Sequence, residues 1–526
     1  LPAKGLFIVL ASVASLGILG LDGYPVLVEV DVSNGLPAFD LVGLPSAAVR
    51  ESRERVRSAI RNSGFDFPLQ RITVNLAPAD LRKDGPAYDL PIALGILAAT
   101  GQIPVDRLEA SFWTGELSLD GRIRGISGAL AMAETVKKET VRTNCSLSLI
   151  VPLENAEEAA LIDGIKVFGA RNLTEVVAAL RDDLPLTQFN SSWSERLQEY
   201  LNNKTAGVNF EQVKGQESTK RALEIAAAGS HNLLLIGPPG AGKTMLIRRF
   251  PTILPSVTFD ESLEITRIYS VAGLLPQGQP VIFERPFRSP HHTCTAVTLV
   301  GGGRIPRPGE VSLAHRGVLF LDELLEFNRE VLEALRQPLE DGQITVSRLN
   351  TTLTFPSRFV LVSSMNPCPC GYYGDNLHEC VCTPQQIKRY RQRLSGPLLD
   401  RFDIQVEVPR LTFDELATEA KGESSVIIRQ RVEEARCRQR ERLARRGLTN
   451  NAEMGSQELE EFCYLDSEGR NLLQMAFEQL GLSARAYNRI LRLARTIADL
   501  AGASDIMASH LAEAIQYRVL DRPILE

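Results

Sequence analysis

Residues 232–244, NLLLIGPPGAGKT, decide the fold of the central part of this chain. The run of four apolar residues predicts a buried strand, and a helical pattern, MLIRRF, follows the glycine-rich stretch. Glycines let the backbone wrap around phosphates with its amides pointing inward, and the closing lysine and threonine supply an ammonium group and a hydroxyl for magnesium. Because a chance glycine turn between a strand and a helix is rare, we expect a site for ATP and Mg²⁺. Its expected contacts are Gly237, Pro238, Pro239, Gly240, Ala241, Gly242, Lys243 and Thr244.

Two further apolar strands are expected to end beside this loop. Residues 318–323, VLFLDE, finish in two acids, of which Asp322 would hold hydrated magnesium and Glu323 would polarise the attacking water. The strand RFVLVSSMN ends at Asn366, which we expect at the same edge of the sheet, where its amide would orient the same water. An acidic strand end alone is weak evidence, but together with the loop it predicts an α/β core that hydrolyses a nucleotide.

Four of the eight cysteines lie in the loop at residues 366–384, NPCPCGYYGDNLHECVCTP. Disulfides, a metal site and reactive thiols are the three alternatives for such a cluster. Clustered cysteines in a reducing cytosol are more often metal ligands than disulfides, so we expect a structural zinc site. The Cys-x-Cys spacing departs from the commoner Cys-x-x-Cys, His378 is an alternative ligand, and reduced free thiols are the alternative to a metal. The expected ligands are Cys368, Cys370, Cys380 and Cys382.

Composition is ordinary for a globular protein. The net charge of −6 means that any contact with nucleic acid must come from local basic patches rather than from the overall field. The first 20 residues, LPAKGLFIVLASVASLGILG, imitate a signal peptide but are short for a membrane span. The alternating strand VLVEVDV follows without a polar break, which favours a buried strand and turn. We therefore expect a cytoplasmic protein that has no contact with the membrane.

The chain length predicts two or three domains. Early patterns predict a helix over 47–62, a strand over 71–77 and a hairpin that turns at Asp120-Gly121. The expected domains are an α+β domain at 1–181, a polar linker at 182–207, the phosphate-binding α/β core at 208–410 and a helical domain at 411–526.

The phosphate-binding loop, the acidic strand and Asn366 together resemble the AAA+ ATPases. The stretches RSPHHT, NPCPCGYYGD, LLDRFD and LRLARTIADL are similar to the ComM/YifB group of magnesium-chelatase-like AAA+ ATPases, which are competence-related DNA helicases. This resemblance covers nearly the full length and implies a homo-hexamer with a C-terminal helical lid. It also implies that Arg401 reaches the ATP of a neighbouring subunit as a finger and that Arg485 contacts nucleotide, with a surface ion pair as the alternative for each.

Residues 83–99, KDGPAYDLPIALGILAA, resemble the active-site segment of the Lon protease domain, which implies a Lon-like N-terminal domain. The position of the Lon serine is Ala87 and that of its lysine is Leu130, and neither side chain can act as nucleophile or base. Lys83 and Lys138 are alternative bases, but no serine replaces Ala87 in the motif. We therefore expect no protease activity.

Two insertions are candidates for DNA contact. The stretch TLVGGGRIPRPGEVS carries Arg304 and Arg307, and QITVSRLNTTLTF predicts a hairpin with Arg348 near its tip. The resemblance implies that such insertions line a central pore, where arginines suit a phosphate backbone. Subunit contacts are the alternative, and the arginine-rich stretch 429–446 is a weaker candidate.

We expect an ATP-driven hexameric DNA translocase or helicase that promotes branch migration during recombination or natural transformation. Its expected partners are single-stranded and branched double-stranded DNA. The alternative is a chelatase-type motor subunit for metal insertion into a porphyrin. The cysteine loop and the Lon-like segment favour the first function.

Overall fold

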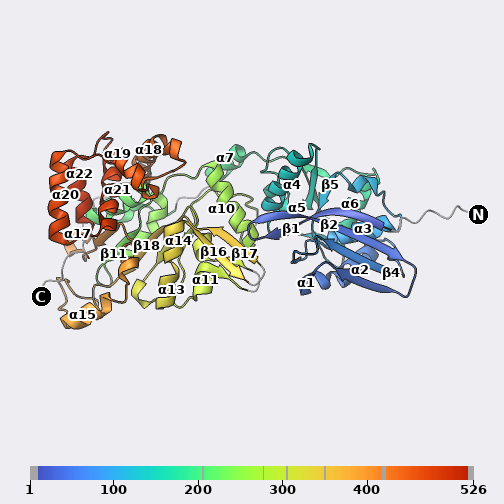
Figure 1. Cartoon of the computed structure of the whole chain (residues 1–526), viewed down its shortest axis with the longest axis horizontal. Coiled ribbons are helices and arrows are strands. Elements are labelled where there is room, and N and C mark those ends of the chain that lie inside the picture. Colours follow the sequence, from blue (N-terminus) through green and yellow to red (C-terminus); the bar gives the residue numbers. More distant parts are fainter. Residues whose placement is uncertain are drawn as a thin grey trace, which may run out of the picture. The chain divides into compact units, whose positions relative to one another are not determined.

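The computed structural model describes residues 10–203, 207–276, 278–303, 306–348, 351–417, 422–518 and 520. Contacts divide the chain into two compact units, whose elements carry the labels of Figure 1. Unit 1 contains residues 1–204 and 259–283, and unit 2 contains residues 205–258 and 284–526. The expected mixed α/β multidomain fold is confirmed, with a parallel sheet and a helical C-terminal region.

Unit 1 is built on an eight-stranded sheet in the order β10-β9-β8-β5-β1-β2-β4-β3. The described part of the N-terminal apolar segment is a strand, because β1 (Leu10–Leu19) pairs antiparallel with β2 (Asp22–Ser33). The other strands are β3 (Ala38–Val42), β4 (Arg71–Ala77), β5 (Ser111–Trp113), β8 (Ser148–Pro152), β9 (Lys166–Ala170) and β10 (Thr187–Phe189).

This sheet has a hydrophobic core on each face, because side chains alternate along a strand. In β1, Ala11 and Val13 join one core and Leu16 joins the other. Helices α2 and α3 cover the first core, and α4 and α5 cover the second. The helices are α1 (Ala47–Arg50), α2 (Ser52–Asn62), α3 (Asp89–Ala99), α4 (Ala129–Thr143), α5 (Leu153–Ala159) and α6 (Leu173–Leu180).

The local predictions for this region are confirmed. The helix expected over 47–62 forms as α1 and α2, and the strand expected over 71–77 is β4. The expected hairpin joins β6 (Glu116–Leu117) to β7 (Ile123–Arg124), and Gly121 has φ +85° in its turn.

Two segments outside residues 1–181 also belong to unit 1. The stretch predicted as a linker contains β10 and α7 (Trp193–Asn203), and α10 (Phe259–Ala272) comes from the middle of the chain. The ring of Trp193 packs edge-on against that of Phe259, with 5.7 Å between centroids. Ser270 of α10 hydrogen-bonds to the buried carboxylate of Glu158 in α5. The predicted domain limits stay a prediction, and α10 is part of the packing of unit 1.

Unit 2 contains a five-stranded parallel sheet in the order β12-β15-β18-β11-β19. Every residue of β11, β15 and β18 is buried, which explains their nearly continuous apolar sequences. The three strands predicted around the nucleotide site are therefore neighbours, with their carboxyl ends at one edge. The strands are β11 (Leu233–Ile236), β12 (Phe287–Arg288), β15 (Val318–Leu321), β18 (Val360–Met365) and β19 (Ile404–Glu407).

Short helices and two hairpins surround this sheet. The expected hairpin is confirmed, since β16 (Gln343–Arg348) pairs antiparallel with β17 (Thr351–Pro356). A smaller one joins β13 (Gly301–Gly302) to β14 (Arg307–Pro308). The helices are α8 (Glu217–Gly229), α9 (Lys243–Arg249), α11 (Ala296–Val300), α12 (Glu310–Leu313), α13 (Arg329–Ala334), α14 (Arg336–Asp341), α15 (Pro384–Arg391), α16 (Gly396–Leu399) and α17 (Phe413–Ala417).

The helical C-terminal region, red in Figure 1, shares one hydrophobic core with the parallel sheet. Val432 of α18 and Ile497 of α21 belong to the same core cluster as Leu235 of β11. None of the helices in the described residues is both long and apolar enough to cross a membrane. The C-terminal helices are α18 (Ser425–Leu443), α19 (Ser456–Phe462), α20 (Ser467–Leu480), α21 (Ala484–Leu500) and α22 (Ala508–Gln516).

Candidate nucleotide site and cysteine loop

The glycine-rich loop connects β11 to α9 at the carboxyl edge of the parallel sheet. Gly240 and Gly242 have φ angles of +80° and +84°, which residues with a Cβ rarely adopt. A Cβ at Gly237 would lie 2.3 Å from the carbonyl oxygen of Val408, so a larger residue is excluded there. The backbone path of the loop therefore requires these glycines.

Lys243 extends back along this loop. Its ammonium group donates hydrogen bonds to the carbonyl oxygens of Gly237 and Pro238, and it lies 3.4 Å from Oδ1 of Asn366. Burial lowers the pKa of Lys243 to about 8, although the Asp322 carboxylate acts in the opposite direction. An anion in the loop would meet a partly desolvated cation, whose attraction is stronger than in water.

Asp322 and Glu323 follow β15 at the same edge. The Asp322 carboxylate accepts a hydrogen bond from the hydroxyl of Thr244 at 3.0 Å and another from that of Ser364. The Ser364 hydroxyl accepts one from the backbone amide of Glu323 at 3.3 Å. Glu323 has φ +53°, an uncommon conformation that often occurs at functional sites. Ser364 was not among the residues predicted from the sequence, although a polar residue within the apolar strand β18 was the available signal.

The four cysteines of the loop after β18 converge. Their sulfur atoms all lie within 4.8 Å of one another. The sulfur of Cys368 is 3.3 Å from that of Cys370 and 3.7 Å from that of Cys380, and the amide of Cys370 donates to the sulfur of Cys382 at 3.4 Å. Sulfurs about 3.8 Å apart are expected around a tetrahedral zinc ion with bonds of about 2.3 Å. The cluster can therefore hold a metal such as zinc.

The surroundings shift the thiol pKa values in opposite directions. Burial opposes ionisation of Cys370, but hydrogen bonds from the amide of Tyr372 and from Cys368 lower its pKa to about 6. Burial raises the pKa of Cys380 to about 12. A divalent cation would favour the thiolate form of every ligand. The His378 ring is stacked on Tyr372, with 4.9 Å between centroids, so the geometry favours four cysteines over a set that includes His378.

Arg401 lies at the opposite edge of the sheet from the glycine-rich loop. It precedes β19, which runs parallel to β11 with Ile404 beside Leu233. The loop leaves the other end of β11, about 13 Å away along a four-residue strand. Arg401 is 5% exposed and pairs with Glu340 of α14. Arg485, in the first turn of α21, is exposed.

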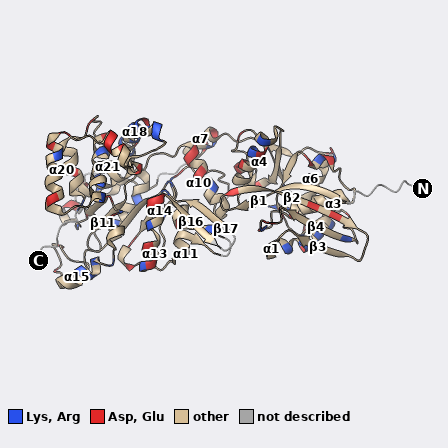
Figure 2. Ribbon diagram, viewed as in Figure 1, with Lys and Arg blue, Asp and Glu red and all other residues tan. Residues whose placement is uncertain are grey.

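The expected DNA-contacting residues are only partly described. Arg304 lies outside the described residues, and for Arg348 only the backbone at the end of β16 is described. Arg307 lies in β14 with an exposed side chain. Figure 2 shows basic and acidic residues interspersed along the elements of both units, as expected from the balanced composition.

Most arginine side chains of the stretch 429–446 form hydrogen bonds within unit 2. Arg436, for example, is buried and donates to the carbonyl oxygens of Ala227 and Ala228 at the end of α8. This use of the side chains argues against the stretch as a DNA-binding face. Six of its eight arginines bond to acceptors in the same chain, namely Arg429, Arg431, Arg436, Arg438, Arg442 and Arg446.

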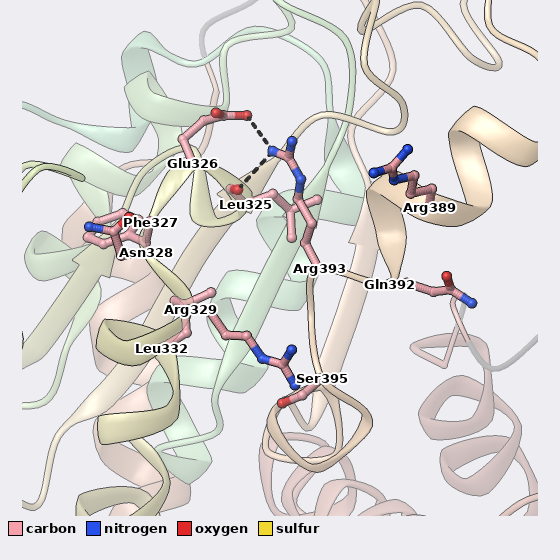
Figure 3. Close-up of a pocket in the computed structure, with 10 residues that line it drawn as sticks. All are labelled: Leu325, Glu326, Phe327, Asn328, Arg329, Leu332, Arg389, Gln392, Arg393 and Ser395. Carbon is pink, nitrogen blue, oxygen red and sulfur yellow. Dashed lines mark hydrogen bonds and ion pairs between the residues drawn. The ribbon is translucent and has the colours of Figure 1, made fainter.

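A pocket of about 540 Å³ opens between the start of α13 and the segment that follows α15 (Figure 3). Arg329, Arg389 and Arg393 line it. Arg393 lies 3.8 Å from the Glu326 carboxylate and 3.4 Å from the carbonyl oxygen of Leu325, as the dashed lines in Figure 3 mark. These arginines were not predicted from the sequence, because only the folded chain brings them together.

Comparison with known proteins places the chain in a family. Residues 209–416 match magnesium chelatase, subunit ChlI, residues 28–155 match subunit ChlI of Mg-chelatase, and residues 422–518 match its C-terminal family. Protein YifB of Salmonella typhimurium is 46% identical over 98% of both chains, and competence protein ComM of Haemophilus influenzae is 45% identical over 98% of both. The chain belongs to the ComM/YifB group of magnesium-chelatase-like proteins. A magnesium-chelatase 38 kDa subunit of Cereibacter sphaeroides is 26% identical over 38% of this chain and 58% of its own.

In this ComM/YifB-group protein, the two residues expected at the positions of the Lon catalytic pair are buried among apolar side chains. Ala87 is 9% exposed, Leu130 is fully buried, and both belong to one core cluster of unit 1. Lys83 donates to the carbonyl oxygens of Pro78 and Leu81, and Lys138 is exposed on α4. The likeness to Lon and the lack of protease activity stay predictions.

Proposed function

We propose that this protein is an ATPase that moves along DNA as a homo-hexamer and that has a ComM-like role in competence. The observation that carries the proposal is the meeting of Lys243, Thr244, Asp322 and Asn366 at one edge of a parallel sheet. Similarity to competence protein ComM over 98% of the chain supports the biological role.

Each side chain at this edge would have a separate role in ATP hydrolysis. The Thr244 hydroxyl and the Asp322 carboxylate, 3.0 Å apart, are hard oxygen ligands of the kind that Mg²⁺ prefers. When bound, Mg²⁺ would neutralise charge on the phosphates. Lys243 would bind the terminal phosphates, Asn366 would orient the water and Glu323 would accept its proton.

The backbone position of Arg401 supports a finger that acts across a subunit boundary, for which its side chain would have to leave Glu340. Arg401 lies at the amino edge of the sheet, away from the loop of its own chain. A finger that serves a neighbour requires a head-to-tail arrangement, which closes into a ring when the rotation between subunits permits. In such a ring we expect Arg304, Arg307 and Arg348 to contact the phosphate backbone, with weaker binding at higher salt. We also propose that Arg485 contacts nucleotide.

The cysteine cluster is proposed to be a structural zinc site. Four protein ligands leave no open position for water, so the ion would shape the loop rather than take part in the reaction. The loop begins next to Asn366, so its folding affects the nucleotide site. Reduced thiols without a metal are the alternative.

A chelatase-type motor is the second candidate function. Two similarities point to it, namely the match to the magnesium chelatase family and the likeness to the 38 kDa subunit. That subunit shares 26% identity over 38% of the chain, whereas ComM shares 45% over 98%, which favours the DNA function. ATP turnover should rise with forked or single-stranded DNA, and the protein should displace a strand from a three-stranded branch. Stimulation by porphyrin-bearing chelatase partners alone would instead establish the second function.

A further inference from the structure

Arg410 connects the cysteine loop to the glycine-rich loop. Its Nη2 donates a hydrogen bond to the carbonyl oxygen of Pro239 at 3.0 Å, and its Nε lies 3.3 Å from Oδ2 of Asp375. The guanidinium carbon lies 5.7 Å from the ring centroid of Tyr372. Tyr372 and Asp375 lie in the cysteine loop, and Pro239 lies in the middle of the glycine-rich loop. One side chain therefore contacts both loops.

Arg410, His378 and the backbone amide of Leu377 are polar neighbours of the Asp375 carboxylate. The Asp375 side chain is only 2% exposed, and a carboxylate so deeply buried needs charged or hydrogen-bonding partners. The same Oδ2 atom lies 3.4 Å from Nδ1 of His378. Arg410 is a permanent cation with a fork of donors, so it can hold the carboxylate and the Pro239 carbonyl at the same time.

The two loops also approach each other directly. A Cβ at Gly371 would lie 2.7 Å from Cδ of Pro239, and Gly371 has φ +88°. Gly371 follows Cys370, one of the four clustered cysteines. The backbone that carries the sulfur cluster is therefore in close contact with the phosphate-binding backbone.

A second side chain supports the glycine-rich loop from elsewhere. Nε2 of Gln216 donates to the carbonyl oxygen of Ala241 at 2.6 Å. Arg410 on Pro239 and Gln216 on Ala241 thus engage two carbonyl groups of the loop from outside it, in addition to those of Gly237 and Pro238, to which Lys243 donates. Carbonyls held in this way would be kept from turning toward a bound phosphate, which would leave the loop amides to bind it.

We propose that Arg410 is a positioning residue through which the metal state of the cysteine loop sets the affinity for nucleotide. The inference rests on the proposed ATPase function and deepens it. Loss of the metal would loosen residues 371–375, and Asp375 would then no longer orient Arg410. The Pro239 carbonyl could turn toward the phosphates and repel them, so ATP would bind more weakly.

The first test measures binding of a fluorescent ATP analogue to full-length variants. Arg410→Ala should weaken binding roughly tenfold, the effect of losing one charge-assisted hydrogen bond, and Asp375→Asn should act in the same direction. Arg410→Lys keeps the charge without the fork and should recover part of the affinity. Lys388→Ala removes a charge from the exposed face of α15 and should bind as the wild type does. Wild-type affinity in Arg410→Ala would overturn the inference.

The second test asks whether the cysteine loop acts through Arg410. Removal of zinc with a chelator, or the Cys368→Ser/Cys380→Ser substitution, should weaken nucleotide binding in the wild type. The same changes should have little further effect in Arg410→Ala, because the connection is already broken. Independent effects that simply add would show that the loop does not act through Arg410.

Three further measurements distinguish a positioning role of Arg410 from loss of the metal, of the fold or of the catalytic base. Zinc content should be unchanged in Arg410→Ala, since Arg410 is not a ligand. Loss of a partner of the buried Asp375 should lower the melting temperature, but the circular dichroism spectrum at the assay temperature should match that of the wild type. Its KM for ATP should rise roughly tenfold while kcat stays within about threefold, because Glu323 is untouched. A wild type that neither binds nor hydrolyses ATP would refute the proposed function itself. An active wild type with an unchanged Arg410→Ala variant would refute only the role of Arg410.

Discussion

Glu323 differs from its neighbour Asp322 in both contacts and backbone. Hydroxyl groups of Thr244 and Ser364 donate hydrogen bonds to the Asp322 carboxylate. Glu323, in contrast, is exposed and has a left-handed backbone conformation. These surroundings suit a metal ligand at Asp322 and a proton acceptor at Glu323. The two adjacent acids are thus expected to have separate roles.

Glu323→Gln should retain ATP binding and lose hydrolysis by about 10²–10⁴-fold, because the amide cannot accept a proton from water. Binding of a fluorescent nucleotide and release of phosphate would be measured side by side. Glu330→Gln, an exposed position on α13, is the matched control and should hydrolyse normally. Normal turnover in Glu323→Gln would assign the base to another residue.

Lys243 makes nucleotide binding depend on pH. Its pKa is lowered to about 8 by burial, and bound phosphates would raise it again, so binding above pH 8 must take up a proton. The affinity for ATP should be nearly constant below pH 7.5 and should fall by up to about tenfold per pH unit above the pKa. Titration calorimetry in two buffers would count the protons. Lys243→Arg keeps its charge and should flatten the profile, and an equally steep profile in that variant would contradict the assignment.

At the scale of elements, α10 is held in unit 1 through a buried carboxylate. Glu158 is 4% exposed and accepts hydrogen bonds from Ser270, from the side chain of Asn155 and from the amide of Leu130. Burial raises the pKa of Glu158, since removal from water disfavours its charged form. Each donor therefore offsets part of a substantial desolvation cost.

Ser270→Ala should lower the free energy of unfolding of unit 1 by about 1–3 kcal/mol, because it removes one donor from a buried acid. Both tryptophans, Trp113 and Trp193, lie in unit 1, so their fluorescence in a urea titration would report its unfolding. The exposed Ser146→Ala is the control and should stay within about 0.5 kcal/mol. A Ser270→Ala variant as stable as this control would show that α10 is held by its apolar contacts alone.

The cysteine loop is the second element with a testable role. Purified protein should contain about one zinc per chain, because one tetrahedral ion takes all four sulfurs. The Cys368→Ser/Cys380→Ser variant should lose the metal and, with it, the stability of the ring. Zinc would be measured by mass spectrometry and assembly by light scattering. The control is a Cys145→Ser/Cys437→Ser variant, which changes two exposed cysteines and should keep its zinc. Metal-free wild-type protein that forms active rings would exclude a structural ion.

At the scale of the whole molecule, the opposite placement of the loop and Arg401 predicts shared active sites. Neither Arg401→Ala nor Lys243→Ala should hydrolyse ATP alone. In rings mixed one to one, about a quarter of the sites should combine an intact Lys243 with an intact Arg401 and regain activity. Turnover after subunit exchange would be compared with that of each variant alone. No recovery in verified mixed rings would mean that Arg401 does not act across the boundary.

The sequence by itself determined the parts whose chemistry lies in contiguous residues. NLLLIGPPGAGKT and VLFLDE encode a strand and the loop that follows it, and the four cysteines encode a cluster that could hold a metal. Backbone freedom and side-chain type act locally in these stretches. Strand neighbours in a parallel sheet then bring Asn366 to Lys243, as expected from where each strand ends.

Only the tertiary structure decided which distant side chains meet. Arg410 and Pro239 are 171 positions apart, and they meet because β19 pairs in parallel beside β11. The same pairing places Arg401 at the far edge of the sheet. Ser270 reaches Glu158 because α10 packs into unit 1 rather than beside the parallel sheet. Such contacts depend on strand order and on the burial of whole helices, which are set by the free energy of the entire fold and leave no local pattern in the sequence.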